Sequence, residues 1–322
     1  MPEPKPDRET TLVGRNLVRK FGDFTAVDGI DFEVHRGEIF GFLGPNGSGK
    51  TTTIRMMLGL LPPSSGFMEV LGIPVGERPE LIRPRVGYMA QQFSMYRDLT
   101  AEQNLRFHGT AYGLTNQELR ARIDQTLDLT GLRGRRHVKT EELSGGWRQR
   151  LALGAAIMHH PQVLFLDEPT AGVDPISRRA FWELLYEQAA SGITVFVTTH
   201  YMEEAEHCHR LAFIRRGRII ATGSPDELRD RFEDGEVLEL APSDAAEAVR
   251  ILRRARAREK LELKEIEMYG SLVHLIGPSV RRKKRSIMRE LRKAGVNPGR
   301  AEIIEPSLED VFIARMRSAE HD

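Results

Sequence analysis

Hydrophobic and polar positions change their period along the chain, and these changes predict the order of the elements. Short β-like runs with turn glycines come first, at residues 12–18, 30–34 and 38–43. Longer helical stretches then alternate with strand-like runs at residues 163–166, 194–199 and 211–214. Alternation of strands with helices is typical of a parallel sheet flanked by helices. We therefore predict an α/β protein in which a small antiparallel layer leads into a parallel core.

The periodicity also predicts the domain organisation. Residues 1–10 are rich in proline and charge and are expected to form a flexible arm. Residues 93–160 are mainly helical in pattern, which predicts a helical insert in a domain that spans 11–225. Beyond Gly223 the order becomes strand, helix, strand, strand, helix, strand, with the second strand expected at 261–268, followed by a last helix at 308–316. This order predicts a ferredoxin-like α+β accessory domain over 226–322.

Composition excludes some classes of function. The 322 residues have a mean hydropathy of -0.38 and contain no apolar stretch near the roughly 18 residues that a membrane-spanning helix needs. Any membrane role would therefore come from a partner. The single cysteine, Cys208, cannot form an internal disulfide, and the first ten residues lack the apolar core of a secretory signal, so cytosol is the expected compartment. The 47 basic and 46 acidic side chains nearly balance, which gives no overall attraction to nucleic acid.

Residues 44–52 carry the strongest chemical signal. They match G-x-x-x-x-G-K-[ST] and follow the strand-like run 39–43. In this context backbone N–H groups surround a phosphate, Lys50 neutralises its β and γ oxygens, and the Thr51 hydroxyl is placed to ligate Mg²⁺. The predicted phosphate-binding residues are Gly44, Pro45, Asn46, Gly47, Ser48, Gly49, Lys50, Thr51 and Thr52. The alternative is a glycine-rich turn with an unrelated lysine, and the motif alone indicates nucleotide binding without specifying a function.

Two acids follow the continuous apolar run 163–166, as expected at the end of a strand buried on both faces. Adjacent carboxylates there are unfavourable without a cation or a proton to handle. We expect Asp167 to serve Mg²⁺ and Glu168 to act as the general base for an attacking water. A pair of solvent-facing acids at a strand end is the alternative.

A second anion site is predicted where Ser144, Gly145 and Gly146 precede a helix-forming run. A chain that binds one nucleotide does not need two phosphate sites. A head-to-tail dimer, in which this tip completes the partner's nucleotide site, would use both. The alternative is an ordinary capped helix.

Taken together, the motifs resemble those of the ATP-binding subunit of an ABC transporter over roughly residues 11–225. GPNGSGKTT resembles the phosphate loop of that family, LSGGW (143–147) its signature and LFLDEP (164–169) its acidic strand. Gln91 resembles the Q-loop glutamine, Asp174 the D-loop aspartate, and His200, after VFVTT, the switch histidine. The resemblance implies a P-loop NTPase core with an N-terminal antiparallel β layer, a second nucleotide-binding domain as partner, and ATP with Mg²⁺ as ligands.

The resemblance also implies roles for single residues. Gln91 would touch Mg²⁺ and the attacking water and link the site to a transmembrane partner, and His200 would contact the γ-phosphate. Phe21 would stack on adenine, with Val27 packed against the same ring, and Asp174 would belong to the nucleotide site. The alternatives are a structural histidine and a core aromatic.

Three positions depart from the family pattern. Trp147 ends the signature where glutamine is usual, Ala171 begins the D-loop where serine is common, and Phe21 replaces the more frequent tyrosine. Because the phosphate donors and both acids are retained, we expect an active ATPase whose rate the sequence leaves open.

Within the family, SGGWRQRLALG, FVTTHYMEEAEHC and PSLEDVFIARM look most like ATPases of drug exporters that work with a separate permease. The expected function is ATP-driven export of a drug-like or lipophilic substrate, from the cytoplasmic face of the membrane. The alternative is a soluble ABC ATPase that acts on ribosomes or DNA, against which we set the single phosphate loop and the absence of sustained heptads before the signature. A regulatory module without turnover is a third reading, which the retained pair of acids disfavours.

Three further clusters allow two readings each. His207, Cys208 and His209 are consecutive and lack the spacing of a metal site, so Cys208 is taken as a packed residue. The basic run 281–285 is either a solvated helix face or a contact for anionic lipid headgroups or permease loops. Phe93, Met95 and Tyr96 form either a permease-docking surface or core.

Overall fold

Three buried strands form the centre of the first unit because their sequences are apolar on both faces. In the computed structural model, β3 (Ile39–Leu43), β7 (Val163–Asp167) and β8 (Thr194–Thr199) are buried at every position. They lie parallel in a six-stranded sheet of order β10-β9-β3-β8-β7-β6. The added strands are β6 (Val86–Met89), β9 (Arg210–Arg215) and the antiparallel β10 (Arg218–Gly223). This sheet aligns the carboxyl ends of several strands at one edge.

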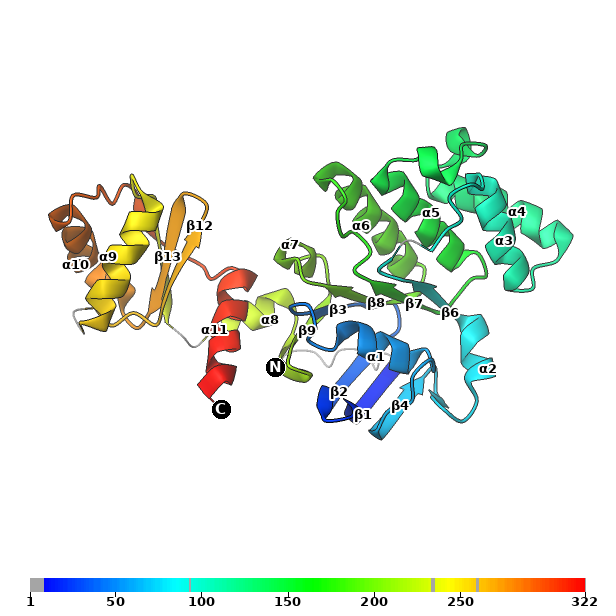
Figure 1. Cartoon of the computed structure of the whole chain (residues 1–322), viewed down its shortest axis with the longest axis horizontal. Helices are drawn as coiled ribbons and strands as arrows, with labels where there is room; N and C mark the ends of the chain where they lie inside the picture. The colour runs from blue at the N-terminus through cyan, green and yellow to red at the C-terminus, as the bar shows by residue number, and fades with distance from the viewer. Residues whose placement is uncertain (1–8, 93, 233–234, 259–260, 322) are drawn as a thin grey trace, which may run out of the picture. The chain divides into compact units, whose positions relative to one another are not determined.

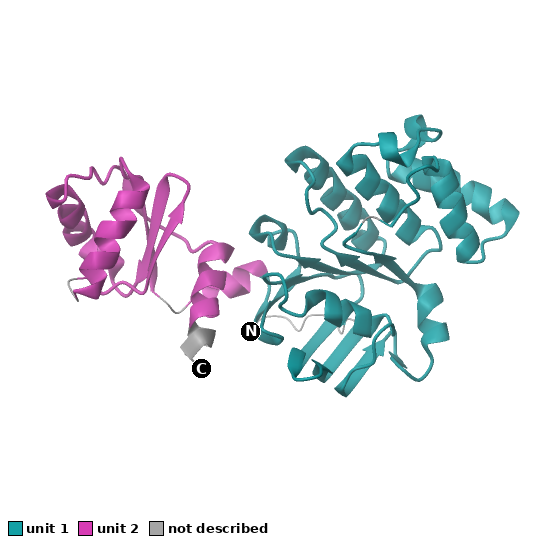
Figure 2. Cartoon of the chain, in the orientation of Figure 1, with its two compact units in different colours: residues 1–224 teal, residues 225–322 magenta. Residues whose placement is uncertain are grey.

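The structure describes residues 9–92, 94–232, 235–258 and 261–321, which form two compact units, 1–224 and 225–322 (Figure 1 and Figure 2). Each unit is treated by itself below. Within the described residues, no helix combines the length and the apolar character needed to cross a bilayer.

A second, antiparallel sheet of the first unit has the order β2-β1-β4-β5. Its strands are β1 (Thr10–Phe21), β2 (Phe24–His35), β4 (Ser65–Val70) and β5 (Ile73–Pro74). Helix α1 (Lys50–Met57) buries Ile54, Met56 and Met57 in a core that both sheets share. Phe32 of β2 lies 5.8 Å, centroid to centroid, from Phe196 of β8, so aromatic packing joins the two layers.

Helices surround the parallel sheet (Figure 1). Helix α2 (Pro79–Ile82) and the short 3-10 turn Arg83–Arg85 precede β6, and α6 (Pro175–Ala190) and α7 (Met202–Ala205) flank β8. Helices α3 (Ala101–Ala111), α4 (Asn116–Leu129) and α5 (Gly145–Ile157) have a core of their own, with Leu105, Ile123 and Leu151 at its centre. Between α4 and α5 the chain makes two 3-10 turns, Arg133–Arg135 and Thr140–Glu142, so the predicted helical stretch is not helical throughout.

The second unit begins with α8 (Pro225–Asp230) and contains a four-stranded antiparallel sheet of order β12-β13-β11-β14. The strands are β11 (Glu236–Leu240), β12 (Glu265–Tyr269), β13 (Leu272–Gly277) and β14 (Ala301–Ile304). Helices α9 (Ala245–Ala257) and α10 (Val280–Lys293) pack on the sheet, and α11 (Leu308–His321) ends the described chain. The order of elements is the ferredoxin-like one.

The predicted fold class, a parallel α/β core with an antiparallel β layer and a small C-terminal sheet unit, is confirmed. Several boundaries differ: the first two strands and the last helix are longer than predicted, and one strand of the second unit starts later. The strand predicted over 261–268 begins only at Glu265. Leu261 and Leu263 are buried in the core of the second unit before the chain joins the sheet. Their alternation therefore reflects burial and not strand pairing.

Candidate functional site

The loop between β3 and α1 is shaped to hold an anion. Gly49 has φ +109°, and a Cβ there would lie 2.6 Å from the Ala26 carbonyl oxygen. A Cβ on Gly44 would lie 2.2 Å from the Ile214 carbonyl oxygen, so only glycine fits at both ends of the loop. The backbone N–H groups of Gly47, Gly49 and Lys50 donate none of the hydrogen bonds found in the described part of the chain. The loop thus presents unused donors, as a phosphate site requires.

Ser48 adds a polar group without a protein partner. Its side chain is 3 % exposed, and its hydroxyl oxygen is buried without a hydrogen bond within the described residues. A buried hydroxyl of this kind is unfavourable unless something else satisfies it. The residues of the loop therefore fit a nucleotide phosphate.

Lys50 is nearly buried and its ammonium group is fully engaged inside the protein. Nζ donates to the carbonyl oxygens of Gly44 at 2.8 Å and Pro45 at 3.2 Å. It also lies 3.1 Å from Oε1 of Glu168. The lysine of the phosphate loop and the acid that directly follows β7 are thus in direct contact.

Glu168 contacts the other two predicted catalytic residues, Gln91 and His200. Its Oε2 accepts a hydrogen bond from Nε2 of Gln91 at 3.0 Å and lies 3.2 Å from Nδ1 of His200. Glu168 itself is 6 % exposed and has φ +48°, the left-handed region that residues with a Cβ rarely adopt. Its backbone N–H is held by Thr198, whose carbonyl and hydroxyl oxygens both lie 3.1 Å away. The structure brings Gln91, Glu168, His200 and Lys50 together at the carboxyl edge of the sheet.

Asp167 and Thr51 form a pair of oxygen donors beside this cluster. The Thr51 hydroxyl donates to Oδ1 of Asp167 at 3.1 Å, and the Thr198 hydroxyl donates to the same oxygen at 2.7 Å. A carboxylate and a hydroxyl are hard oxygen ligands, which suit Mg²⁺ together with phosphate oxygens and water. The residues present therefore fit the ion that the sequence predicts.

The tip formed by Ser144, Gly145 and Gly146 begins α5 in a different part of the unit. Ser144 is exposed and its side chain makes no cap hydrogen bond. A Cβ on Gly145 would meet open space, whereas one on Gly146 would lie 2.4 Å from the side chain of Ser177 in α6. Neither Ser144 nor Gly145 hydrogen-bonds to the phosphate loop within the residues described here. Gly146 is thus needed for helix packing, and the other two are free to meet something outside this chain.

Asp174 begins α6, where its carboxylate accepts a hydrogen bond from the backbone N–H of Ser177 at 2.9 Å. This hydrogen bond holds the pKa of Asp174 below its ordinary value. The exposed side chain thus caps a helix in this structure. No described contact joins it to the nucleotide loop.

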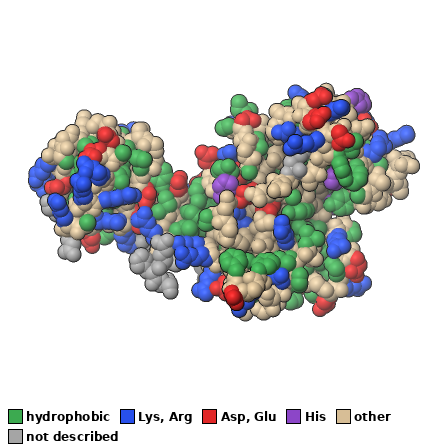
Figure 3. All heavy atoms as spheres, in the orientation of Figure 1, with side chains coloured by type: hydrophobic (Ala, Val, Ile, Leu, Met, Phe, Trp, Pro, Cys, Tyr) green, Lys and Arg blue, Asp and Glu red, His purple; other side chains and the backbone are tan. Residues whose placement is uncertain are grey.

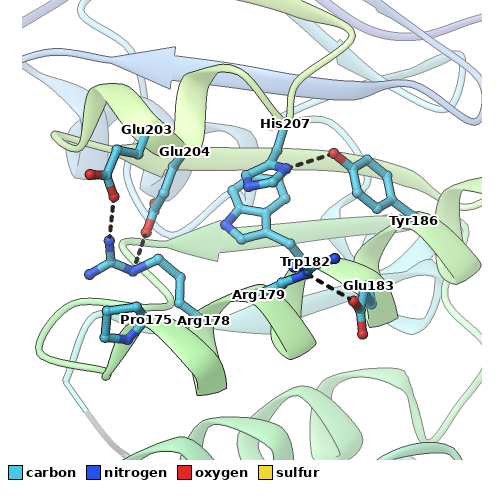
Figure 4. A pocket seen from close by; sticks show the side chains of 9 residues that line it. All are labelled: Pro175, Arg178, Arg179, Trp182, Glu183, Tyr186, Glu203, Glu204 and His207. Carbon is cyan, nitrogen blue, oxygen red and sulfur yellow. Dashed lines mark hydrogen bonds and ion pairs between the residues drawn. The ribbon is translucent and has the colours of Figure 1, made fainter.

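A hollow of about 480 Å³ lies beside this helix and is separate from the nucleotide cluster (Figure 4). Arg178 crosses it, with Nη1 3.3 Å from Glu203 and Nε 3.5 Å from Glu204 on α7. Glu204, 1 % exposed, also accepts a hydrogen bond from Thr170, and Arg178 donates to the Val173 carbonyl oxygen at 3.4 Å. Arg178 therefore ties the segment after Glu168 to the helix after His200.

The two residues expected at the adenine ring differ in their surroundings. Phe21 is 46 % exposed at the β1–β2 hairpin and the guanidinium of Arg19 lies 4.5 Å from its ring centre. Its hairpin partner Phe24 is 62 % exposed and offers a second aromatic surface that the sequence analysis did not select. Val27 is fully buried and packs against the backbone of the phosphate loop at Gly49, so in this structure it has no surface for an adenine ring. Val27 therefore packs beneath the phosphate loop, whereas the sequence predicted contact with the adenine ring.

The structure gives the surroundings of the sequence clusters that allowed two interpretations. No group of three or more possible metal ligands occurs among the described residues, and Cys208 is buried, which raises the pKa of its thiol. Met95 is buried and Tyr96 is 48 % exposed, in edge-to-face contact with Phe107 on α3, while Phe93 lies outside the described residues.

Trp147, which departs from the family pattern, lies close to Arg135 and Arg150, with guanidinium carbons 4.0 and 4.6 Å from its ring centre.

Sequence reasoning missed three contributors to the site: Thr198, Ser177 and the pair formed by Arg178 and Glu204. The available signal for Thr198 was a hydroxyl near the end of the strand, two residues before His200. Ser177 and Arg178 carry no such signal, because their importance depends on how α6 crosses α5 and α7.

Comparison with known proteins places these motifs in context. A family model described as ABC transporter matches residues 27–171, which include the phosphate loop, Gln91, the serine-glycine tip and both acids. The chain is 36% identical over 304 residues to the linearmycin resistance ATP-binding protein LnrL of Bacillus subtilis, covering 94% of this chain and 97% of that protein.

Two further matches differ in coverage. Over 228 residues the chain is 49% identical to the probable multidrug ABC transporter ATP-binding protein YbhF of Escherichia coli, covering 71% of this chain. The match covers only 39% of YbhF, so the chain spans about two fifths of that relative's length. The solved structure of the ATP-binding cassette MJ0796, a dimer in a post-hydrolysis state bound to ADP and Pi, has a TM-score of 0.60 and 25% identity, covering 66% of this chain and 98% of that one.

Proposed function

The chain belongs to the family of ABC transporter ATP-binding subunits, whose members hydrolyse ATP, and on that premise we propose that it powers export of a drug-like or lipophilic substrate through a separate transmembrane permease. The observation that carries the proposal is the contact of Glu168 with Lys50, Gln91 and His200. It joins the predicted base and the phosphate-loop lysine, which are both buried, to Gln91, which is exposed, and to His200, which is half-buried. The names of LnrL and YbhF, a resistance protein and a probable multidrug transporter subunit, support export as the direction.

In the proposed reaction Lys50 turns from Glu168 to the β- and γ-phosphates when ATP enters the loop. The carboxylate of Glu168 is then available to accept the proton of the attacking water, which Gln91 orients. His200 donates a hydrogen bond to the γ-phosphate. Asp167 and Thr51 would hold Mg²⁺, which would neutralise the charge that develops on the phosphate oxygens.

A second nucleotide-binding domain, a copy of this chain or a related one, is proposed to complete each site. Ser144 is exposed and Gly145 half-buried at a helix N-terminus, and the Ser144 side chain makes no cap hydrogen bond there, which suits the pair to donate to a phosphate held by the partner. The MJ0796 cassette, which is a dimer in its post-hydrolysis state, supports this arrangement. A Glu168→Gln variant with ATP should run as a dimer in size-exclusion chromatography, and Ser144→Glu should keep it monomeric.

The proposed permease contact lies on the helical part of the first unit. Tyr96 and Phe107 are 48 and 47 % exposed and touch each other, next to a shallow hollow of about 410 Å³ lined by residues of α3. Exposed aromatic pairs of this kind are enriched in protein interfaces. The chain would then lie peripherally on the cytoplasmic face of the membrane.

The alternative, an ABC ATPase that acts on ribosomes or DNA, predicts different binding partners. Helices α3 and α4, before the signature, are 11 and 14 residues long and pack in one core, so no long coiled-coil arm is present in that described segment. The deciding experiment is purification of the tagged chain from solubilised membranes. A polytopic membrane protein in stoichiometric amount supports the proposal, and recovery with ribosomes or DNA overturns it. Substitution of Tyr96 and Phe107 by serine should release the membrane protein, while Leu129→Ser, at an exposed leucine of α4, should not.

A further inference from the structure

Helix α10 of the second unit concentrates positive charge to an unusual degree. Residues 226–322 hold 20 basic and 20 acidic side chains, yet the 14 residues of α10 include eight basic ones and a single acid, Glu290. The rest of the unit is therefore acidic by the same amount. The unit has no net charge, but its positive charge is concentrated on one helix.

The basic side chains are not spread evenly around the helix. Arg282, Arg285, Arg289 and Arg292 are all exposed and, at 3.6 residues per turn, fall within an arc of roughly 80°. Val280, Ile287 and Leu291 lie on the opposite side and are buried against the unit's own core. The four arginines thus form a stripe about 15 Å long that points away from the sheet. In Figure 3, Lys and Arg side chains lie over the part of the unit where Figure 1 shows α9 and α10.

The stripe is not neutralised inside the protein. Arg281 and Lys283 pair with Glu236 and Glu262. Among the described residues, none of the four stripe arginines pairs with an acid. Arg282 and Arg289 donate only to serine hydroxyls of the same helix region, Ser279 and Ser286. Four guanidinium groups are therefore left for an external polyanion.

We propose that this arginine stripe binds the anionic phospholipid headgroups of a membrane surface, and so orients the C-terminal unit toward the bilayer. The inference extends the proposed function but does not need it, because lipid binding requires neither nucleotide nor permease. Guanidinium groups match phosphate oxygens, and a row of them on a convex helix can meet several headgroups of a fluid surface at once. The apolar face of α10 is used for packing, so binding is electrostatic, without insertion of the helix.

Nucleic acid is the less favoured polyanion. The stripe has no aromatic side chain on which a base could stack, and α10 contains neither asparagine nor glutamine to read a base edge. Binding to nucleic acid phosphates is therefore the competing outcome that the test must distinguish from lipid binding.

The test is sedimentation of the purified full chain with vesicles of phosphatidylcholine, alone or mixed with phosphatidylglycerol. Wild type should bind only the mixed vesicles, and binding should fall as added salt shortens the screening length. Arg285→Gln combined with Arg289→Gln should weaken binding at low salt by about 5-fold per charge, roughly 25-fold in total. The matched control, Arg83→Gln with Arg120→Gln, removes two exposed arginines of the first unit and should bind like wild type.

The outcomes are distinct. Equal binding to neutral vesicles, or unchanged binding by the α10 variant with an unchanged melting temperature, overturns the proposal. Stronger binding to a single-stranded RNA homopolymer than to mixed vesicles at the same salt also overturns it. None of these results bears on ATP hydrolysis, so failure here and failure of the proposed transport function are separable.

Discussion

Nζ of Lys50 lies 3.1 Å from Oε1 of Glu168, and the two side chains are 4 and 6 % exposed. A buried pair of this kind is stable only while both members are present, because removal of one leaves the other charge uncompensated. Without nucleotide, Lys50, which would bind phosphate, is therefore paired with Glu168, which would activate water. Phosphate and carboxylate compete for the same ammonium group.

Glu168→Gln should lower phosphate release by about 100-fold or more, because a general base contributes on that scale. ATP affinity should be unchanged or higher, since the neutral amide competes less for Lys50. Phosphate release and equilibrium binding of a fluorescent ATP analogue measure the two effects. Glu203→Gln, at a carboxylate that is 88 % exposed, is the control and should hydrolyse normally. A normal rate in the Glu168 variant would remove the assigned base.

Thr51→Val should raise the Mg²⁺ concentration needed for half-maximal hydrolysis by about 10-fold or more, because it deletes one of two paired oxygen donors. ATP binding measured in EDTA should not change, since the phosphate loop is intact. If the variant follows the wild-type Mg²⁺ titration, the metal is held elsewhere.

Gly146→Ala should lower the free energy of unfolding by about 1–3 kcal/mol, because the new methyl would lie 2.4 Å from the Ser177 side chain. Denaturant unfolding measures this change. Gly145→Ala is the matched control, since its methyl meets open space and stability should hold. Combining Gly146→Ala with Ser177→Gly should recover part of the loss. Independent, additive losses would show that the two residues do not touch.

Arg178→Ala should destabilise the chain by roughly 3 kcal/mol, because Glu204 would remain buried without its partner. It should also lower kcat for ATP with little change in KM, since no described contact joins the Arg178 side chain to the phosphate loop, while it connects the segments on either side of the site. Adding Glu204→Gln should restore stability. Arg179→Ala, which removes an 83 % exposed arginine of the same hollow, should change neither value.

The second unit should be less stable at alkaline pH. Burial alone would lower the pKa of His274, but its contacts with Asp310 at 3.0 Å and Glu239 at 3.3 Å outweigh burial and raise it. A raised pKa stabilises the fold below the unfolded value and the stabilisation is lost as pH rises through the folded one. Hydrogen exchange in β13 and α11 should therefore quicken as pH rises above the unfolded histidine pKa, near 6.5, beyond the intrinsic rise of exchange rate with pH.

His274→Gln should remove that excess pH dependence, whereas His137→Gln, at a histidine that is 82 % exposed, should leave it in place. On the acid side, burial raises the pKa of Asp310, but His274 and Ser307 lower it overall. Protonation of this aspartate should therefore destabilise the unit only below its unfolded pKa, near 4. Equal exchange across the alkaline range would contradict the assignment.

How much of the site could be predicted depends on how local its determinants are. The glycines of the phosphate loop and the acids after β7 act through backbone geometry and strand burial, which neighbouring residues specify. The contacts of Gly146 with Ser177 and of Arg178 with Glu204 depend on the crossing of helices, which periodicity does not encode. Val27 is an intermediate case. Its place before the loop was visible in the sequence, but its burial beneath Gly49 was not.

The thiol of Cys208 is the chain's single sulfhydryl, and burial both shields it and raises its pKa. Thiolate-directed reagents should therefore leave the folded wild-type chain unlabelled. A cysteine introduced by Ser144→Cys or Asn46→Cys would then be the sole reactive handle on the surface. Spectroscopic probes and bifunctional linkers could be attached at either position without first replacing the native cysteine. The distance between these positions on two neighbouring subunits could then be measured directly.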